Sequence, residues 1–453
     1  MDNNAAPVGT LKQEESTDLR RVITQPRMLL FILGDVLGAG VYVLIGQVAV
    51  EVGGAVWAPF LLAFFFAIFT ACSYAELVTK YPRAGGAAVF VQRAFGNSFL
   101  SFLTGFAMMS AAVTAASSLA VAFAGDYLAE FVTVQPTAAA LVFLLAVGVL
   151  NVRGIEESMR VNVVLTLVEV SGLALAIMLG YATVIAGEAD PARALQFRND
   201  VSLPLAILGG SVLAFYAFQG FETSANAAEE SIDPRRTYPR ALLWALAIAG
   251  IVYVMIGIAL PMVVPVEVLA GSSGPLLELV KRAPITFPPR LFSLIALLAV
   301  SNGALLFTIS ASRLLYGMAR EGLVPSAFGR LLPVRRTPPV AILVTMLLAV
   351  ALVVTGDLET LAETTVLLLV LVYLAVNVSV LALRRHPVDI PHFRAPSILP
   401  VLGSLSCLLV LTQQTAATAG RAVLLLAVGV ALYGLTRLTL RWSSVDQRFD
   451  GLA

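Results

Sequence analysis

The sequence predicts an all-α polytopic membrane protein, and three observations carry that prediction. The chain has 453 residues, of which 59% are hydrophobic and only 13% are charged, whereas soluble domains carry about 25% charged residues. The mean hydropathy is +0.90. Apolar runs long enough to cross a bilayer core of about 30 Å recur along the whole chain. A soluble protein of this composition would lack the polar surface that it needs.

Apolar length predicts about twelve membrane-spanning helices. A polar N-terminal tail, 1–27, precedes them, and a C-terminal tail, 441–453, follows them. The expected spans are residues 28–50, 55–79, 97–124, 137–153, 160–186, 203–228, 240–265, 288–317, 338–355, 361–384, 397–418 and 421–440. The loop at 229–240 contains two prolines, which argue against a continuous helix there.

The basic residues predict how the chain is oriented in the membrane. An even number of spans places both termini on one side, and 23 of the 29 Lys and Arg residues lie in segments on that side. Cytoplasmic loops carry an excess of Lys and Arg. We therefore expect a multi-pass protein of the cell membrane with both termini in the cytoplasm.

Composition and motifs exclude several other functions. The net charge is +1, so no strong field points to nucleic acid. Cys72 and Cys407 lie in apolar segments without zinc or disulfide spacing, and His386 and His392 have no ligand cluster beside them. No metal site or other cofactor is expected. The sequence holds no HExxH, GxSxG or Walker motif, so neither an enzyme nor an ATPase is expected.

The first span contains an unusual segment, GDVLGAGVYVLIG at 34–46, which holds one charge, Asp35, and four glycines. Glycine costs about 1 kcal/mol relative to alanine inside a helix. Non-helical backbone survives in a membrane only where protein or a cavity supplies hydrogen-bond partners. The segment therefore predicts a helix that stops and restarts at Gly38–Ala39–Gly40. The alternative is close helix packing through the Gly34-xxx-Gly38 spacing.

A break of this kind predicts a binding site. The second half-helix would present free N–H groups and the positive end of its dipole, which suit a carboxylate. The first half-helix would present free carbonyls, which suit an ammonium group or a cation.

The sixth span carries a second interruption, in FYAFQGFETSANAAEE at 215–230, where Gly220 lies between aromatic residues. Spans 1 and 6 are five apart, so they run in opposite directions. Two interrupted spans at matching positions of two halves indicate an inverted-repeat transporter. We expect five-helix repeats at 28–186 and 203–384, followed by two additional helices within 397–440.

Five motifs, in order, resemble those of the amino acid–polyamine–organocation (APC) superfamily of permeases. They are GAGVY in span 1, YAELVTKYPRAGGAAVFVQRAFG at 74–96, LNVRGIEESMRVNVVLTLVE at 150–169, FYAFQGFETSANAAEESIDPRRTYPRA from Phe215, and SRLLYGMAREGLVP at 312–325. The resemblance covers most of residues 28–330. It implies the five-plus-five inverted-repeat APC fold with spans 1 and 6 discontinuous. It also implies a substrate that bears an amine and usually a carboxylate.

The resemblance places the substrate at the two interruptions. In relatives, backbone N–H groups at the first break hold the carboxylate, and carbonyls near both breaks hold the amine. Carried onto this sequence, the carboxylate would meet the N–H groups of Gly38, Ala39, Gly40 and Val41 at the first break. The amine would meet the carbonyls of Val36 and Leu37 beside the first break and those of Phe215, Tyr216 and Phe218 beside the second, which lies at Gly220.

Two side chains in the second interruption are candidates for the substrate site. Tyr216 takes the position of an aromatic gate in relatives, where a ring face covers an ammonium group. The alternative is an aromatic residue that only fills space. Gln219 stands where relatives often have an apolar residue. Either it recognises the substrate side chain, or it bonds backbone freed at the break.

Five acidic residues lie within or at the edge of the expected spans. A mid-membrane Asp costs about 2.5–3.5 kcal/mol, so such residues usually face cavities or partners and mark ion or proton paths. Glu76 is expected to pair with Arg83 or Arg153. Asp35 can cage an amine or a cation, or it can bond Ser or Asn on a neighbouring helix. Glu222 can stabilise freed amides or titrate, and Glu363 is expected at the membrane interface. The fifth acid is Glu169.

Glu169 is the principal candidate for energy coupling. The resemblance aligns it with a span 5 position that often carries lysine in proton-coupled relatives. Either Glu169 titrates in its place, or the site binds a cation such as sodium, or coupling is absent and the protein exchanges substrates. Ser301 and Asn302 in span 8 are expected to face span 1 near this site.

These observations predict a secondary transporter of amino acids or related amines, working by proton symport. Spans 1, 2, 6 and 7 would rock against spans 3, 4, 5 and 8 in an alternating-access cycle. Exchange without ion coupling is the alternative, and a membrane-embedded amino acid sensor is a more remote one. The expected partners are the small-molecule substrate, the coupling ion and membrane lipid.

Overall fold

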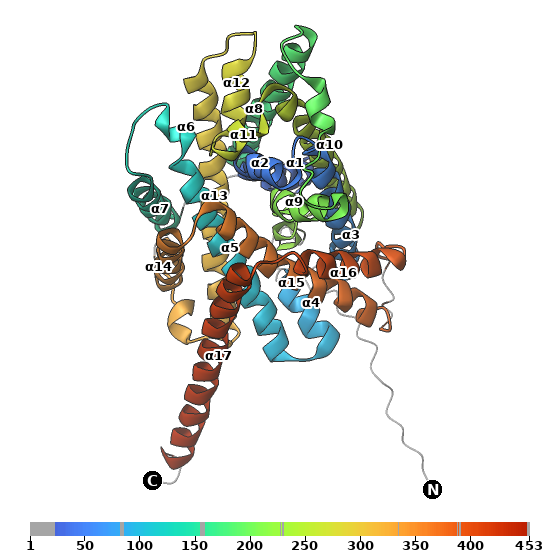
Figure 1. The fold of residues 1–453 in the computed structure, drawn as a ribbon. Coiled ribbons are helices and arrows are strands. Elements are labelled where there is room, and N and C mark those ends of the chain that lie inside the picture. The colour runs from blue at the N-terminus through green and yellow to red at the C-terminus, as the bar shows by residue number, and fades with distance from the viewer. Residues whose placement is uncertain are drawn as a thin grey trace.

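The computed structural model is built from helices (Figure 1). It describes residues 23–450 apart from 82–85, 155–158, 227, 229–230, 334, 387 and 389–390. Within that part of the chain, extended pairing is limited to two isolated bridges, which join Ile23 to Ser231 and Gly53 to Phe197. The all-α class predicted from the sequence is confirmed.

The helices follow one another with short connections. In the first half they are α1 Gln25–Val36, α2 Ala39–Val52, α3 Trp57–Lys80, α4 Gly86–Phe95, α5 Ser98–Phe123, α6 Asp126–Ala129, α7 Pro136–Arg153 and α8 Met159–Ile185. In the second half they are η1 Pro191–Leu195, α9 Leu203–Ala217, η2 Thr223–Asn226, α10 Pro234–Val263, α11 Val266–Ala270, α12 Pro275–Arg282, α13 Pro289–Arg320, η4 Ser326–Gly329, α14 Pro339–Thr355, α15 Leu358–Leu383, α16 Ile398–Leu411 and α17 Ala416–Asp450.

Many of these helices suit a membrane. Within the described residues, 8 helices are long and apolar enough to span it, and α1 with α2 forms one further candidate that bends by 41°. Three shorter apolar helices, α9, α14 and α16, have 10–17 residues each. The chain is therefore a multi-pass membrane protein, and the count of twelve spans stays a prediction.

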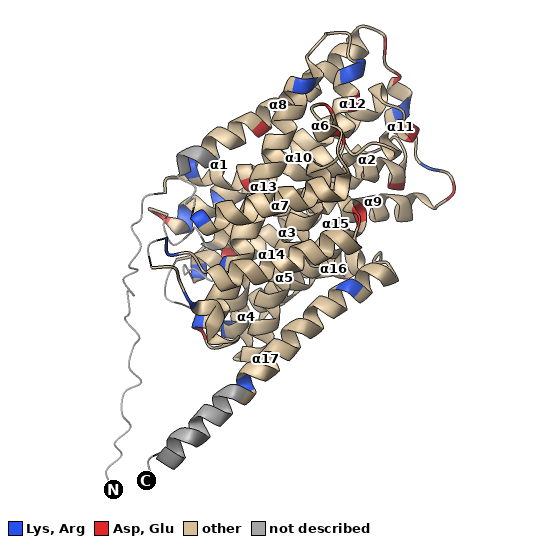
Figure 2. Cartoon of the chain, turned by 90° about the vertical axis from the view of Figure 1, so that its left-hand side faces the viewer, with Lys and Arg blue, Asp and Glu red and all other residues tan. Residues whose placement is uncertain are grey.

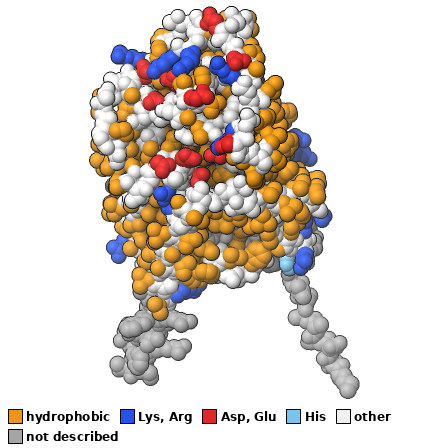
Figure 3. All heavy atoms as spheres, viewed as in Figure 1, with side chains coloured by type: hydrophobic (Ala, Val, Ile, Leu, Met, Phe, Trp, Pro, Cys, Tyr) orange, Lys and Arg blue, Asp and Glu red, His pale blue; other side chains and the backbone are white. Residues whose placement is uncertain are grey.

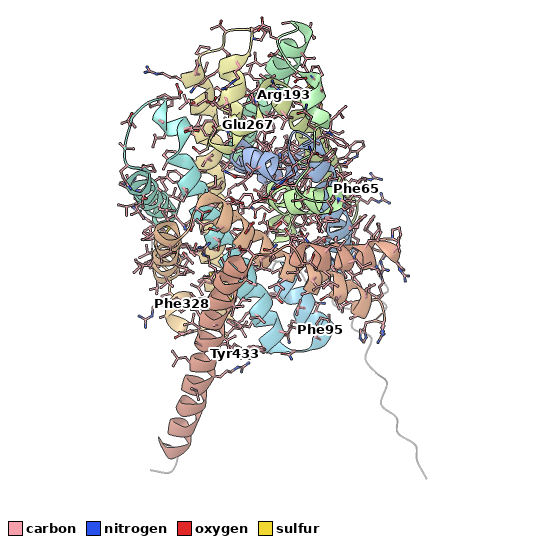
Figure 4. All side chains as sticks on the ribbon, viewed as in Figure 1. Phe65, Phe95, Arg193, Glu267, Phe328 and Tyr433 are labelled. Carbon is pink, nitrogen blue, oxygen red and sulfur yellow. The ribbon has the colours of Figure 1, made fainter. Side chains whose placement is uncertain are left out.

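The outer surface of the helices is largely apolar, as contact with lipid requires. Hydrophobic side chains cover much of the face shown in Figure 3. Leu145 and Ile251 are more than half exposed, and Phe65 on α3 points away from the bundle (Figure 4). Lys and Arg gather along one edge of the bundle, at the left of Figure 2.

The helix α10 corrects one prediction. The segment 229–240 was expected to be a loop, but α10 begins at Pro234 and continues through Pro239. A proline at the first helical position removes an N–H group that has no partner there in any case. Pro239 lies five residues further on, so it removes a single backbone hydrogen bond near the N-terminal end of α10, and the helix continues.

The broken first span lies at the centre of the bundle. Figure 1 shows α1 and α2 beside α9, and α2 packs on α9 while α1 packs on α10. Next to this group, α5 packs against α13 and α15. The Tyr433 ring of α17 packs edge-on against Phe99 and in a tilted arrangement against Phe102 of α5, and so attaches the last helix to the outside of the bundle (Figure 4).

Glu76 of α3 has a partner that was not predicted. Arg384 Nε and Nη2 lie 2.8 and 2.6 Å from its two carboxylate oxygens. Glu76 was expected to pair with Arg153 or with Arg83, which is outside the described residues. That prediction was wrong because the true partner is 308 residues away, at the end of α15.

A second contact joins the same two helix ends. Lys80 Nζ donates to the carbonyls of Leu383 and His386 at 2.6 and 2.8 Å. In addition, the Ala395 N–H donates to Glu76 at 2.9 Å. The end of α3 is thereby tied to the end of α15 and to the segment that leads into α16.

Candidate substrate-binding site

The first interruption lies between α1 and α2. Helix α1 ends at Val36 and α2 begins at Ala39, so only Leu37 and Gly38 leave the helix. The break is therefore present, but it is shorter and earlier than predicted, because Ala39 and Gly40 belong to the first turn of α2. The N–H groups of the first turn of any helix have no acceptor within that helix. Ala39 and Gly40 can therefore be helical although the chain before them is not.

The first turn of α2 faces the end of α9. A methyl group added at Gly40 would lie 2.8 Å from Ala217 Cα, so glycine permits this close approach. The N–H groups of this turn, up to Val41, have no acceptor within the helix and lie at its positive end. The arrangement is chemically suited to an anionic group such as a carboxylate.

The second interruption follows α9, which ends at Ala217. Residues 218–222 form turns, and the 3₁₀-helix η2 follows. Gly220 has φ +108°, a conformation that residues with a side chain rarely adopt. The predicted interruption of span 6 is therefore present, and it is longer than the interruption of span 1.

The two interruptions touch each other at Gly220. A Cβ atom built there would lie 2.7 Å from the Asp35 carbonyl oxygen. Thr223 Oγ1 lies 2.6 Å from Asp35 Oδ2 and 2.7 Å from the Gly220 carbonyl oxygen. Asp35 thus bonds a threonine of the other broken span, where the sequence suggested a serine or an asparagine. Segments far apart in the chain meet at this point.

Glu222 holds the second interruption in shape. Its Oε2 atom accepts hydrogen bonds from the Gly220 N–H at 2.9 Å and from the Tyr373 hydroxyl of α15 at 2.7 Å. The side chain is 2% exposed. The bond to the Gly220 N–H corresponds to the first of the two roles suggested for Glu222, and Tyr373 is an additional partner.

The two candidate side chains of the second interruption lie together. Tyr216 is buried, and its hydroxyl faces the Ala115 carbonyl of α5 at 3.4 Å. Gln219 lies against the Tyr216 hydroxyl. Gln219 is 5% exposed, and its Oε1 atom has no hydrogen-bond partner among the described residues. A buried acceptor without a donor costs about 1–3 kcal/mol, so a donor from a bound molecule would be stabilising there.

The carbonyls near the interruptions differ in what they already bind. Those of Phe215 and Tyr216 accept from the N–H groups of Phe218 and Gln219 at 3.1 and 3.3 Å. A carbonyl oxygen has two lone pairs, so each keeps one further acceptor position. The Val36 carbonyl accepts from the Tyr253 hydroxyl of α10.

Glu169 of α8 is brought together with one of its two expected neighbours. It is 1% exposed, and Asn302 Nδ2 donates to its Oε1 atom at 2.9 Å. The Tyr42 hydroxyl of α2 donates to the Glu169 carbonyl at 2.6 Å. Ser301 instead bonds the Leu297 carbonyl of its own helix at 2.6 Å.

Helix α13 also contacts the start of α2, through Gly303, the residue that follows Asn302. A methyl group added at Gly303 would lie 3.5 Å from Ala39 Cβ. Asn302, its neighbour in the chain, reaches Glu169. The pair Glu169–Asn302 is therefore adjacent to the start of α2, which is the arrangement that the sequence indicated for span 8.

Comparison with known proteins decides the family. A family profile described as "Amino acid permease" matches residues 23–432. The chain belongs to the amino acid permease family. Its relatives place it in the APC superfamily, and the permease is a transporter, not an enzyme.

Three relatives illustrate the range of this family. The branched-chain amino acid permease of Bacillus subtilis is 25% identical over 440 residues, covering 92% of this chain and 93% of the relative. The methylthioribose transporter of Bacillus subtilis is 26% identical, covering 95% and 96%. The vacuolar cationic amino acid transporter 2 of Arabidopsis thaliana is 30% identical, covering 83% and 62%. Their names give different substrates, so membership of the family indicates a transporter but does not identify the substrate.

Sequence reasoning missed three hydroxyl groups at this site. Tyr42, Tyr253 and Tyr373 are all fully buried and all donate to groups at or beside the interruptions. Tyrosine in spanning helices is usually read as a membrane-interface residue. The available signal was the position of Tyr253 in the middle of an apolar span, where an interface role does not apply.

Proposed function

We propose that the permease is a secondary active transporter that carries amino acids or related amines across the cell membrane by alternating access. The contact between the two interruptions at Gly220 is the observation that carries the proposal. The proposal includes twelve spans, with both termini in the cytoplasm. Ten of the spans form inverted repeats at 28–186 and 203–384, and two further helices lie within 397–440. Spans 1, 2, 6 and 7 would rock against spans 3, 4, 5 and 8.

In this proposal the substrate lies at the two helix breaks. Its carboxylate meets the N–H groups between Gly38 and Val41, at the positive end of α2. Its amine meets the remaining acceptor positions on the Leu37, Phe215, Tyr216 and Phe218 carbonyls. Tyr216, beside the second break, covers the bound substrate as the gate.

Gln219 is proposed to contribute to substrate choice. Its Oε1 atom is buried without a donor, which supports contact with an N–H or O–H group of the substrate. A site built to bond such a group rejects analogues that lack it, because its own polar atom is then left unpaired. Gln219→Leu should weaken transport of polar substrates and leave apolar ones less affected.

The energy source is proposed to be a proton gradient, with Glu169 as the group that carries the proton. Glu169 is buried and lies beside the start of α2, with Asn302 as its partner. Glu222, which accepts from Gly220 and Tyr373, and Asp35, which accepts from Thr223, are further candidates for the proton carrier. A sodium ion at the Glu169–Asn302 pair, or exchange without coupling, are the alternatives.

Reconstitution in proteoliposomes tests the function. Purified permease is given a panel of radiolabelled amino acids and amines, with and without an inward-directed pH gradient, in sodium or choline buffer. We expect uptake of at least one amino acid or amine, accelerated by the pH gradient. If no compound in the panel moves or binds, the transporter proposal fails. Counterflow without any effect of pH or sodium favours the exchanger.

The variant Glu169→Gln tests the coupling role. We expect loss of pH-driven accumulation, while exchange of internal for external substrate continues, because glutamine cannot release a proton. Glu363→Gln is the matched control, since Glu363 is also an acid of a spanning helix but is bonded by Thr418 of α17 and not by Asn302. Undiminished pH-driven accumulation in Glu169→Gln would rule out the proton role.

A further inference from the structure

The connection between η4 and α14 is a closed loop that carries three arginines, Arg330, Arg335 and Arg336, and is called the basic loop below. The Leu332 N–H donates to the Thr337 carbonyl at 2.9 Å, and the Arg336 N–H donates to the Leu332 carbonyl at 2.9 Å. Arg336 has φ +53° and is the one non-glycine residue with a positive φ in the described part of the chain. Residues with a side chain adopt this conformation at a cost in free energy. The loop therefore holds its backbone in a shape that local preference does not favour.

Contacts with the neighbouring helices hold the basic loop in place. Thr337 Oγ1 donates to the Val152 carbonyl of α7 at 3.0 Å. Gly154, the residue after α7, faces the loop, because a methyl group added there would lie 3.3 Å from the Arg335 carbonyl oxygen. On the other side, the buried Phe328 fixes η4 beside α14 at the edge of the bundle (Figure 4). The arginines are thus carried on an anchored backbone.

The charge of the basic loop is not balanced by its described neighbours. All three arginine side chains are exposed, and within the described residues none of them has a hydrogen bond or an ion pair. Arg153 ends α7 nearby, but the acids Glu156 and Glu157 follow it outside the described residues, so Arg153 is not counted here. Guanidinium groups bind phosphate oxygens through parallel N–H donors. The loop is therefore suited to a phosphate group.

A surface that faces lipid lies directly beside the basic loop. Helix α14 begins at Pro339, and its Leu343 and Leu347 are each 59% exposed. They are four residues apart and so lie on one face of the helix. Val149 near the end of α7, which packs on α14, is also exposed, as is Leu331 within the loop. Apolar side chains for acyl chains and arginines for a headgroup are thus adjacent.

We propose that the basic loop binds the phosphate group of an anionic phospholipid of the cytoplasmic leaflet, whose acyl chains lie along α14 and α7. The choice of leaflet rests on the proposed function, which places both termini, and with them this loop, on the cytoplasmic side. That leaflet is negatively charged and attracts basic segments next to spanning helices. A soluble phosphate has the same headgroup chemistry but would leave the exposed leucines without a partner.

The test compares the double variant Arg335→Gln/Arg336→Gln with Arg235→Gln/Arg236→Gln in the full-length permease. Arg235 and Arg236 are also adjacent, exposed and expected on the cytoplasmic side, but they belong to the first turn of α10. Both double variants lose two positive charges. The purified protein in a neutral detergent is titrated with dioleoylphosphatidylglycerol, with dioleoylphosphatidylcholine or with inorganic phosphate, and its melting temperature is measured.

We expect phosphatidylglycerol to raise the melting temperature of the wild type more than phosphatidylcholine does. The concentration for half of this effect should rise about tenfold or more in Arg335→Gln/Arg336→Gln, since two basic residues that attract an anionic lipid are lost. The α10 double variant should respond as the wild type does. Added sodium chloride should weaken the response of the wild type, because salt screens exposed charges.

A second variant, Arg336→Gly, keeps the test decisive if the double variant is not recovered. It removes one charge, and glycine adopts φ +53° without the cost that arginine bears. Its melting temperature without added lipid should therefore not fall, while its response to phosphatidylglycerol should be weaker than that of the wild type.

Three results would overturn the inference. The first is a wild-type response to phosphatidylglycerol in the variants of the basic loop. The second is an equal loss in the two double variants, which would make the effect one of overall surface charge. The third is an effect of inorganic phosphate as large as that of phosphatidylglycerol at the same concentration, which would make the loop a site for a free anion.

The lipid titration separates this inference from the proposed function, because it needs neither transport nor a known substrate. If the wild type moves no amino acid or amine, the transporter proposal fails, yet the titration still decides whether the basic loop binds an anionic phospholipid. Conversely, a permease that transports normally but shows no preference for phosphatidylglycerol would overturn the lipid site alone.

Discussion

The two broken spans solve the same problem in different ways. In span 1 the chain leaves the helix for two residues, bends by 41° and resumes at Ala39. In span 6 the chain leaves the helix at Ala217, and the next α-helix that the structure describes begins at Pro234. Both must supply partners for backbone groups inside a membrane.

The partners differ in origin. The short interruption draws on other helices, since the Val36 carbonyl is bonded by Tyr253 of α10. The long interruption carries polar side chains of its own, Glu222 and Thr223, which bond Gly220. A short break is thus stabilised by its surroundings and a long one partly by itself. Substitutions should therefore have different effects in the two places.

The largest effect is expected for Gly220→Ala. The residue has φ +108°, and the new methyl group would lie 2.7 Å from the Asp35 carbonyl oxygen. Backbone strain of about 1–3 kcal/mol adds to a steric cost of about 1–3 kcal/mol. We expect substrate uptake in proteoliposomes to fall at least tenfold, about 1.4 kcal/mol, while the protein still inserts.

The control for this variant is Gly187→Ala. Gly187 also has a positive φ, +74°, but a methyl group there meets nothing within 4 Å. It therefore bears the backbone cost without the collision. Equal losses in the two variants would show that the contact between the interruptions is unimportant.

A smaller effect is expected for Gly40→Ala. The backbone here is helical and accepts alanine, so only the collision with Ala217 Cα at 2.8 Å remains. Overpacking of this kind costs about 1–3 kcal/mol. Substrate binding, measured by scintillation proximity, should weaken. Gly317→Ala in α13 meets nothing within 4 Å and should leave binding unchanged; weakened binding there would point to a general effect of removing helix glycines.

Thr223→Val should have a moderate effect that distinguishes the two breaks. It removes the hydroxyl that links Asp35 of span 1 to Gly220 of span 6. Losing an ordinary hydrogen bond costs about 0.5–1.5 kcal/mol. We expect a rise in KM with a smaller change in maximal rate. An unchanged KM would mean that the two interruptions hold together without this link.

The smallest effect is expected at the C-terminal end of α2. Arg198 donates to Val52 at the end of this helix and holds Asp200, whose pKa it lowers to about 2. Because that pKa is lowered, the ion pair is formed at neutral pH and is lost only as the pH falls towards about 2. The pair is largely exposed to solvent and contributes little to stability, so Asp200→Asn should change neither uptake nor melting temperature between pH 5 and 8. A clear change would show that this exposed loop is coupled to the break.

The arrangement of helices was largely predictable because it depends on local sequence. Apolar length marks a span wherever it lies, and α3, α5, α7, α8, α13 and α14 begin and end within about three residues of the expected bounds. The start of α10 was not predictable from its prolines alone, since both fall where a helix tolerates them. The short helices α11 and α12 carry too few residues for a periodic signal.

The backbone of the site was more predictable than its side chains. Glycines at 38, 40 and 220 indicated where the helices break, because the cost of glycine is a local property. The partners of the acids depend on contacts across the fold. Tyr373 reaches Glu222 from 151 residues away, and Tyr253 reaches Val36 from 217 residues away. Spacing along one sequence carries no information on such pairs.

The crossed ties between the ends of α3 and α15 have a mechanical consequence. Glu76 of α3 accepts hydrogen bonds from the Arg384 guanidinium, and Lys80 of α3 donates to the carbonyls of Leu383 and His386. Because both contacts join the same two helix ends, moving either end away from the other would stretch both contacts. Any displacement of the end of α3 should therefore move the end of α15 with it.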